Sequence, residues 1–177
     1  MSNEIKKLAA SFQRYLRKEY SDIKTILKFN SQFQLLVSIV LSAQTTDENV
    51  NKATKGLFKK YPNAKLLSAA KLSDIESLVF STGFYKVKSK NIHTLSKVLV
   101  SDYNSRIPKT IDELVKLPGV GRKTASVFLA ETFDQPTIAV DTHVLRVSHR
   151  LGFSSKRYDP IQTEKELKQL FPKNFWR

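Results

Sequence analysis

Apolar side chains recur at intervals of three and four residues along almost the whole chain, and this spacing limits the fold more than any other feature. The first segment, residues 3–19, shows it with Ile5, Leu8, Phe12 and Leu16. Such spacing gathers apolar side chains on one face of an α-helix. No segment alternates convincingly between apolar and polar residues as a strand would. The sequence therefore predicts an all-α fold of roughly ten helices.

Capping signals predict where several helices begin and end. Ser31–Gln34, Ser73–Glu76 and Thr110–Glu113 follow the capping-box pattern, in which Ser or Thr precedes Glu or Gln by three residues. Asp159-Pro160 predicts a cap followed by proline at the first helical position. Gly83 fits the residue just past a helix end.

The charge balance indicates a polyanionic partner. The chain has 30 Lys and Arg against 16 Asp and Glu, a formal net charge of +14. A fold does not need this excess, and self-repulsion costs it some stability. Contact with nucleic acid is the simplest reason to keep it. A basic proteome or solubility alone is the alternative explanation.

Several classes of protein are excluded by composition. The chain has no cysteine, so disulfides, thiolate metal sites and cysteine nucleophiles are ruled out. Its three histidines lack a metal-ligand spacing, and we predict no metal site. No apolar run approaches the ~20 residues of a membrane span, and the N-terminus has no signal-peptide core. We expect no membrane association and a location in the cytoplasm, at the nucleoid.

A glycine-rich turn joins two of the predicted helices and is the first candidate site. It consists of Leu117, Pro118, Gly119, Val120, Gly121 and Arg122. Glycine permits positive φ and close approach of another backbone. The helix that follows presents unpaired N–H groups and the positive end of its dipole, which bind a phosphate without reading sequence. A tight turn that binds nothing is the alternative, and the net charge favours contact with DNA.

Lys123 and Asp141 are candidate catalytic residues. Lys123 is expected in the first turn of the second helix, where the dipole, Arg122 and partial burial would favour the neutral, nucleophilic amine. A solvated or phosphate-contacting lysine is the plainer interpretation. Asp141 stands at an ideal N-cap position, and most such aspartates are only caps. An ionised carboxylate near Lys123 could also take its proton or stabilise a cationic sugar.

Separated motifs together resemble endonuclease III, the bifunctional DNA glycosylase and abasic-site lyase family of the helix-hairpin-helix superfamily. The order and spacing fit over about residues 5–175. The matching segments are residues 35–47, 83–85, 117–125 and 137–144. Adenine-specific relatives carry a glutamate where this chain has Ile39, and relatives that only hydrolyse the glycosidic bond lack the hairpin lysine.

The resemblance implies a role for each candidate. Lys123 matches the nucleophile that attacks the deoxyribose C1′, and Asp141 matches the carboxylate that assists it. Residues 117–123 match the DNA-clamping hairpin. Gln44 matches the residue that fills the gap left by an extruded nucleotide. Phe84 falls where the family usually has a leucine wedge; an aromatic ring can also wedge and stack, and this departure bears on opposite-base preference.

The resemblance also implies an architecture and a partner. We expect a two-domain fold with the active-site cleft between a domain over residues 22–135, whose helix-hairpin-helix covers about 111–133, and a second domain from residues 1–21 and 136–177. The expected partner is double-stranded DNA containing damaged pyrimidines or abasic sites, bound by a monomer.

One departure concerns the end of the chain. The family usually continues into a four-cysteine loop that binds a [4Fe–4S] cluster, whereas this sequence ends at Trp176-Arg177 without any cysteine. We therefore expect no cluster in this chain and a second domain that is incomplete, and a truncated gene product, a fragment and a naturally short chain stay open as explanations. We also expect the final apolar residues to lack a packing partner.

Three functions remain open from the sequence. The first is a glycosylase and lyase that uses Lys123 and Asp141. The second is a helix-hairpin-helix DNA-binding protein without catalysis. A helix-turn-helix regulator is the third, although the sequence has no identifiable recognition helix with base-reading side chains.

Overall fold

A computed structural model describes residues 2–20, 25–155 and 157–176, and these residues form ten α-helices and two short 3₁₀ helices but no strand. The predicted all-α class is confirmed. The chain divides into a central unit, residues 25–128, and a terminal unit made of residues 1–24 and 129–177. The domain extents predicted from the sequence stay a prediction, and the predicted boundary after residue 21 lies outside the described residues.

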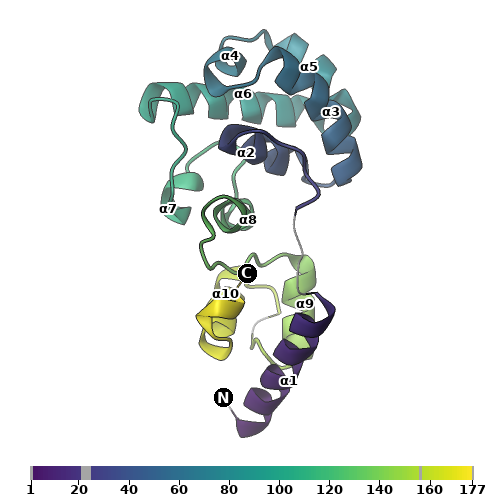
Figure 1. The fold of residues 1–177 in the computed structure, drawn as a ribbon, viewed down its shortest axis with the longest axis vertical. Coiled ribbons are helices and arrows are strands. Elements are labelled where there is room, and N and C mark those ends of the chain that lie inside the picture. Colours follow the sequence, from purple (N-terminus) through teal and green to yellow (C-terminus); the bar gives the residue numbers. More distant parts are fainter. Residues whose placement is uncertain (1, 21–24, 156, 177) are drawn as a thin grey trace. The chain divides into compact units, whose positions relative to one another are not determined.

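Helices α2 to α7 and the first part of α8 make up the central unit, and the rest of α8 belongs to the terminal unit (Figure 1). Helices α4 and α5 pack along α6, and α3 packs against α5 and α2. The elements are α2 (Gln32–Leu41), α3 (Asp47–Lys60), α4 (Ala64–Ser68), α5 (Leu72–Val79), η1 (Phe80–Thr82), α6 (Tyr85–Asp102), α7 (Ile111–Leu114) and α8 (Arg122–Phe133).

Helix α2 forms the core of the central unit. Every residue from Phe33 to Leu41 is buried. A helix that is apolar nearly all round must be surrounded by other elements. Its one buried amide, Gln34, is satisfied at both ends: Oε1 accepts from the Asn30 N–H at 2.9 Å, and Nε2 donates to the Pro62 carbonyl at 3.3 Å.

Most predicted caps are confirmed. The Ser31, Thr110 and Asp159 side chains accept from the backbone N–H three residues on, and Gly83 ends η1 with φ of +67°. The box predicted at Ser73 is wrong. Helix α5 begins at Leu72 after an uncapped Lys71, whose carbonyl already accepts from the amides of residues 74 and 75. Ser73 therefore lies inside the helix.

The terminal unit has its own aromatic core. The Phe12 ring is tilted by 60° against Phe153 at 5.6 Å between ring centroids, and Phe153 meets Phe171 edge to face at 5.5 Å. Ala9 and Leu167 complete the buried cluster. The elements are α1 (Asn3–Glu19), the end of α8, α9 (Thr142–Arg150), α10 (Pro160–Leu170) and η2 (Lys173–Phe175).

The last apolar residues of the chain have packing partners, so the expectation that they would lack them is wrong. Phe175 lies 5.3 Å from Phe171 between ring centroids. Trp176 donates its indole N–H to the Phe171 carbonyl at 2.9 Å. Both side chains pack against the aromatic core of the terminal unit, because α10 and η2 turn the chain end back onto it.

A carboxylate ties the segment after α9 to α10. Glu166 accepts from the Ser155 hydroxyl at 2.6 Å, from the Ser155 N–H at 2.9 Å and from Gln162 Nε2 at 3.0 Å. Burial by itself would raise the pKa of Glu166, but these hydrogen bonds outweigh it and lower the pKa to about 2. The ionised form of Glu166 therefore stabilises the terminal unit.

We predict that Glu166→Gln destabilises the protein at neutral pH but not at low pH. Because the pKa of Glu166 is depressed on folding, its contribution is present above the ordinary value of 4.5 and lost as pH falls toward 2. Urea unfolding at pH 7 should show a loss of about 1 kcal/mol, allowing for solvent screening. The loss should shrink through pH 4 to pH 3.

Glu19→Gln, at the exposed end of α1, is the matched control and should leave the stability nearly unchanged at each pH. A loss for Glu166→Gln that stays constant from pH 7 to pH 3 would contradict the assignment.

Candidate nucleic-acid interface

The glycine-rich turn folds as two successive tight turns between α7 and α8. The Leu117 N–H donates to the Leu114 carbonyl at 3.0 Å, and the Val120 N–H donates to the Leu117 carbonyl at 3.1 Å. Leu117 and Val120 are buried and fix the turn to the core, while Gly119 and Gly121 are exposed. The hairpin therefore presents backbone, and not bulky side chains, to a ligand.

The two glycines serve different purposes. Gly119 has φ of +78°, and a Cβ there would lie 3.0 Å from Asn91 and 3.1 Å from Val40. Gly121 lies outside the left-handed region, and a Cβ there would meet nothing within 4 Å. Folding requires glycine at position 119. No contact within the protein requires glycine at position 121, which indicates that a ligand approaches the backbone closely there.

The N-terminus of α8 offers backbone donors beside the turn. The first intrahelical bond of α8 runs from the Ala125 N–H to the Gly121 carbonyl at 2.9 Å. The amides of Lys123 and Thr124 precede it, and an α-helix provides no acceptor for such groups. These amides and the positive end of the helix dipole are the features predicted from the sequence to bind a phosphate.

Lys123 lies in the first turn of α8, as predicted, and its side chain is exposed. The partial burial considered from the sequence is absent, whereas the helix N-terminus and the adjacent Arg122 are present. An exposed amine at the edge of a backbone phosphate site can reach a sugar whose phosphate is bound there. The central unit thus brings the predicted nucleophile and the predicted hairpin together.

Asp141 belongs to the terminal unit and caps α9. Its Oδ1 accepts from the N–H groups of His143 at 2.9 Å and Val144 at 2.8 Å. Both bonds end on one oxygen, and Oδ2 has no hydrogen bond to any residue that the structure describes. The preceding Ile138 and Val140 pack against the aromatic core and hold the cap in place. Capping and a chemical role are therefore compatible, because different oxygens serve them.

Gln44 and Phe84 share an unusual backbone conformation. Both are exposed and both have positive φ, +54° for Gln44 and +47° for Phe84. A bulky residue seldom adopts this conformation, which is retained where the surroundings impose it and function uses it. Phe84 is 68% exposed, so burial does not explain its aromatic ring. No sequence pattern indicated this conformation at either residue.

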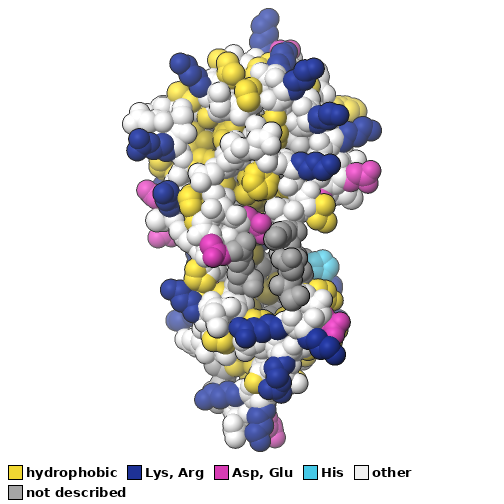
Figure 2. All heavy atoms as spheres, viewed as in Figure 1, with side chains coloured by type: hydrophobic (Ala, Val, Ile, Leu, Met, Phe, Trp, Pro, Cys, Tyr) yellow, Lys and Arg dark blue, Asp and Glu magenta, His cyan; other side chains and the backbone are white. Residues whose placement is uncertain are grey.

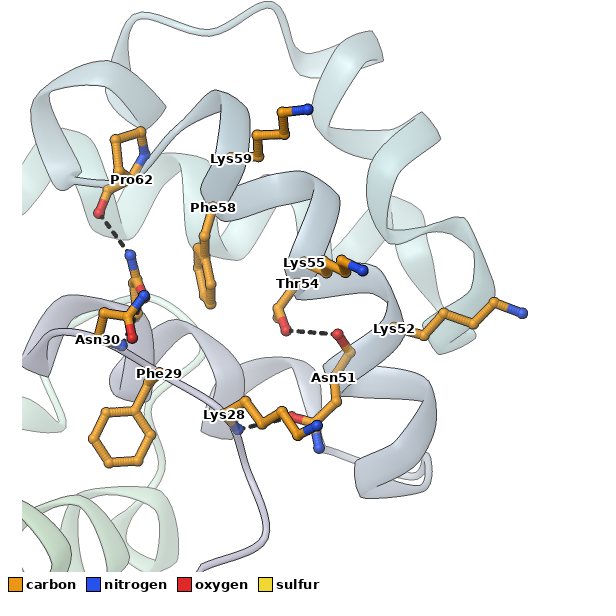
Figure 3. A pocket seen from close by; sticks show the side chains of 11 residues that line it. Lys28, Phe29, Asn30, Asn51, Lys52, Thr54, Lys55, Phe58, Lys59 and Pro62 are labelled. Atoms are coloured by element: carbon orange, nitrogen blue, oxygen red, sulfur yellow. Dashed lines mark hydrogen bonds between the residues drawn. The ribbon is translucent and has the colours of Figure 1, made fainter.

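Positive charge is spread over the surface, and it gathers around a hollow beside α3. Figure 2 shows many Lys and Arg side chains on the face it presents, with fewer acidic ones. The hollow has a volume of about 720 Å³, and Phe58 points from α3 toward the segment that carries Phe29 and Asn30 (Figure 3). Its lining includes four lysines, Lys28, Lys52, Lys55 and Lys59, and no acidic residue.

The described residues contain no group of three or more His, Asp or Glu side chains that could hold a metal ion. A [4Fe–4S] cluster needs thiolate ligands, and the sequence has no cysteine to supply them. The residues present therefore do not fit the cluster that the resemblance implies for the family.

No helix in the described part of the chain is long and apolar enough to cross a membrane.

Comparison with known proteins gives a consistent family. The HhH-GPD superfamily of base excision DNA repair proteins matches residues 37–173. Endonuclease III of Synechocystis sp. is 42% identical over 183 residues, which cover 99% of this chain and 83% of that protein. Endonuclease III of Bacillus subtilis is 46% identical over 150 residues, which cover 85% of this chain and 68% of that protein.

Solved structures agree with the sequence comparison. A trapped endonuclease III–DNA covalent intermediate superposes with a TM-score of 0.91 at 43% identity, covering 97% of this chain and 80% of that one. A non-covalent endonuclease III–DNA complex gives 0.90 at the same identity and coverage. A thermostable thymine-DNA glycosylase gives 0.79 at 20% identity over 96% and 80% of the two chains, which shows a shared fold.

We predict that alanine lowers stability at one hairpin glycine and weakens DNA binding at the other. Gly119→Ala should lower the free energy of unfolding by about 2 kcal/mol, because its φ is positive and its Cβ would crowd two side chains. Gly121→Ala should change stability by less than about 0.5 kcal/mol. It should nevertheless weaken binding to duplex DNA, because its Cβ would stand where a phosphate approaches.

Urea unfolding and fluorescence anisotropy with labelled duplex measure the two effects, and the unfolding of Gly121→Ala shows whether its loss of binding is separate from any loss of stability. Unchanged duplex affinity in Gly121→Ala would contradict the assignment of this turn as a DNA contact.

Proposed function

Because this chain belongs to the endonuclease III family of the HhH-GPD superfamily of base excision DNA repair proteins, we propose that it is a DNA glycosylase and abasic-site lyase. The observation that carries the proposal is the position of Lys123. An exposed amine in the first turn of α8 adjoins a hairpin whose backbone can bind a phosphate. A single element thus supplies both the DNA anchor and the nucleophile.

The proposed reaction begins with extrusion of the damaged nucleotide, because a base inside a duplex cannot be reached. Lys123 Nζ attacks the sugar C1′, the bond from C1′ to the base breaks, and the base leaves with the bonding electrons. Asp141 takes the proton that the amine loses and stabilises the positive charge that develops on the sugar. Oδ2, which makes neither of the two capping hydrogen bonds, is the oxygen suited to this role.

Strand cleavage follows from the covalent intermediate. The C1′–O4′ bond then breaks: O4′ gains a proton, the nitrogen loses one, and the opened sugar stays joined to Lys123 as an imine that makes the C2′ protons acidic. Loss of one C2′ proton expels the 3′ phosphate, so the strand breaks 3′ to the lesion by β-elimination. The elimination is redox-neutral, because the imine takes up the electrons of the C2′–H bond and the departing phosphate carries away those of the C3′–O bond.

Gln44 and Phe84 are proposed to hold the duplex open. Both side chains project from strained, exposed backbone positions in the central unit, as residues that enter a duplex must. Gln44 would occupy the space left by the extruded nucleotide, and Phe84 would wedge into the opposite strand. An aromatic ring can stack on the neighbouring bases of either strand.

Finer points of the function are also part of the proposal. The lesions we propose are oxidised or ring-saturated pyrimidines, together with abasic sites in duplex DNA. The protein would act as a monomer where the DNA lies, in the cytoplasm at the nucleoid. Its chemistry would proceed without an iron–sulfur cluster in this chain, since no step above passes through one.

The competing function is DNA binding without catalysis. The hairpin alone supports it, because a backbone phosphate site needs no nucleophile. An exposed Lys123 suits either function, whereas Asp141 favours the enzyme, because capping α9 uses only its Oδ1 and leaves Oδ2 for chemistry.

We predict that borohydride traps the wild-type protein on abasic-site DNA and that Lys123→Ala abolishes the adduct. Lys55→Ala is the matched control, because Lys55 is also an exposed lysine on a helix of the central unit but lines the α3 hollow (Figure 3). It should leave the adduct yield within about twofold. Gel electrophoresis of the reduced products gives the measurement. Binding of DNA without any adduct would leave only the non-catalytic function.

We predict that Asp141→Asn separates capping from chemistry. Asparagine caps a helix nearly as well as aspartate, so the free energy of unfolding should change by less than about 0.5 kcal/mol. Turnover on lesion-containing duplex should fall by about a hundredfold or more, because the amide cannot take a proton. Single-turnover kinetics and thermal unfolding measure the two effects. Equal, small losses of turnover and of stability would show that Asp141 only caps α9.

A further inference from the structure

Lys88 is an unusual residue in the central unit, because its side chain is only 5% exposed. Lysine is almost never this deeply buried without a carboxylate partner. Its ammonium group forms no ion pair with any residue that the structure describes. Instead, Nζ donates to the backbone carbonyl of Thr82 at 2.6 Å. Burial lowers the pKa of Lys88, as expected for an ammonium removed from water.

The same residue makes a second bond to the same loop. The Lys88 backbone N–H donates to the Phe84 carbonyl at 3.0 Å. The Val87 N–H donates to the same carbonyl, so this is the ordinary bonding of the first turn of α6, and the bond that only the lysine side chain makes is the one to Thr82, directly before Gly83. Thr82 is itself buried, and its hydroxyl donates to the Val79 carbonyl at 2.7 Å. The loop is thus anchored to the core at its start and to α6 at its end.

Between those two carbonyls the backbone takes a conformation that it would not hold unaided. Gly83 has φ of +67° and Phe84 has φ of +47°. Two successive residues with positive φ are costly when the second is a bulky aromatic in the left-handed region. Phe84 also gains little from packing, since it is 68% exposed. The restraint has to come from the neighbours: the Lys88 side chain holds the Thr82 carbonyl on one side, and the first turn of α6 holds the Phe84 carbonyl on the other.

A structural role alone does not account for a lysine at this position. Methionine has a similar length, fills buried space without losing hydration, and needs no hydrogen-bond partner. What lysine adds is a donor directed at the Thr82 carbonyl. The cost of burying the ammonium is therefore incurred for the geometry of the loop and not for filling the core.

We propose that Lys88 is a positioning residue that holds the Gly83–Phe84 loop ready to enter duplex DNA before the DNA binds. The proposal rests on the proposed function, because it assigns Phe84 as the wedge. A side chain held in its bound conformation avoids the ordering cost on association, so preorganisation raises affinity for the distorted duplex without any new contact.

The test uses a substrate that needs no wedge. A single-stranded abasic oligonucleotide has no opposite strand to enter, whereas the same abasic site in a duplex does. In borohydride trapping, Lys88→Met should reduce the rate on the duplex by about tenfold and leave the rate on the single strand within about twofold. Phe84→Ala should show the same pattern, and Lys86→Met, at an exposed lysine on the same helix, should show neither loss.

Combining the changes sharpens the test. If Lys88 acts through the wedge, Lys88→Met should cause no further loss on the duplex in a Phe84→Ala background. Additive losses, or equal losses on the duplex and the single strand, would overturn the proposal and mark Lys88 as a residue of general stability. Absence of any wild-type adduct on either substrate would instead refute the proposed function.

Folding is checked by thermal unfolding of each variant. Should Lys88→Met fail to fold, Lys88→Gln retains a donor on a shorter side chain and should give an intermediate loss on the duplex. Failure of both variants to fold would also overturn the proposal, since Lys88 would then be a requirement of the fold.

Discussion

The contact of Gly119 with α2 and α6 is the constraint on which the interface depends. No side chain separates the turn from Val40 and Asn91, so the hairpin lies directly on the most buried helix of the central unit. That contact fixes where α8 begins, and the start of α8 fixes Lys123 and the backbone donors beside it. A hairpin held one side chain farther from the core would not place these groups in the same way.

Two of the non-glycine residues that the structure describes with positive φ, Gln44 and Phe84, are those proposed to enter DNA. Gln44 follows the C-terminus of α2, and Phe84 precedes α6, so both lie at the ends of rigid helices. Short turns at helix ends can be held in unfavourable conformations because the helices fix them on either side. Lys88 shows one way in which this is achieved, with a buried ammonium in place of an apolar side chain.

Much of the fold could be predicted from periodicity and caps, and the misses have physical causes. The box at Ser73 looked like a helix start, but the preceding Lys71 carbonyl had already begun the helix. The final aromatic residues looked unpartnered because the cluster they pack against joins the nearby Phe171 to Ala9 and Phe153, which are distant in sequence. The spacing of residues along the chain predicts local geometry. Packing depends on contacts between distant segments, which that spacing does not predict.

The sequence by itself determined the helical class, the hairpin with its lysine, the cap at Asp141 and the charge that suits DNA. Each follows from neighbouring residues, because helix periodicity, capping and turn chemistry act within a few positions. Only the tertiary structure decided that Gly119 serves the fold while Gly121 is left open, that Oδ2 of Asp141 is uncommitted, and that Lys88 is buried behind Phe84. These depend on which side chains from distant segments fill the space around a residue, and chain order does not specify that.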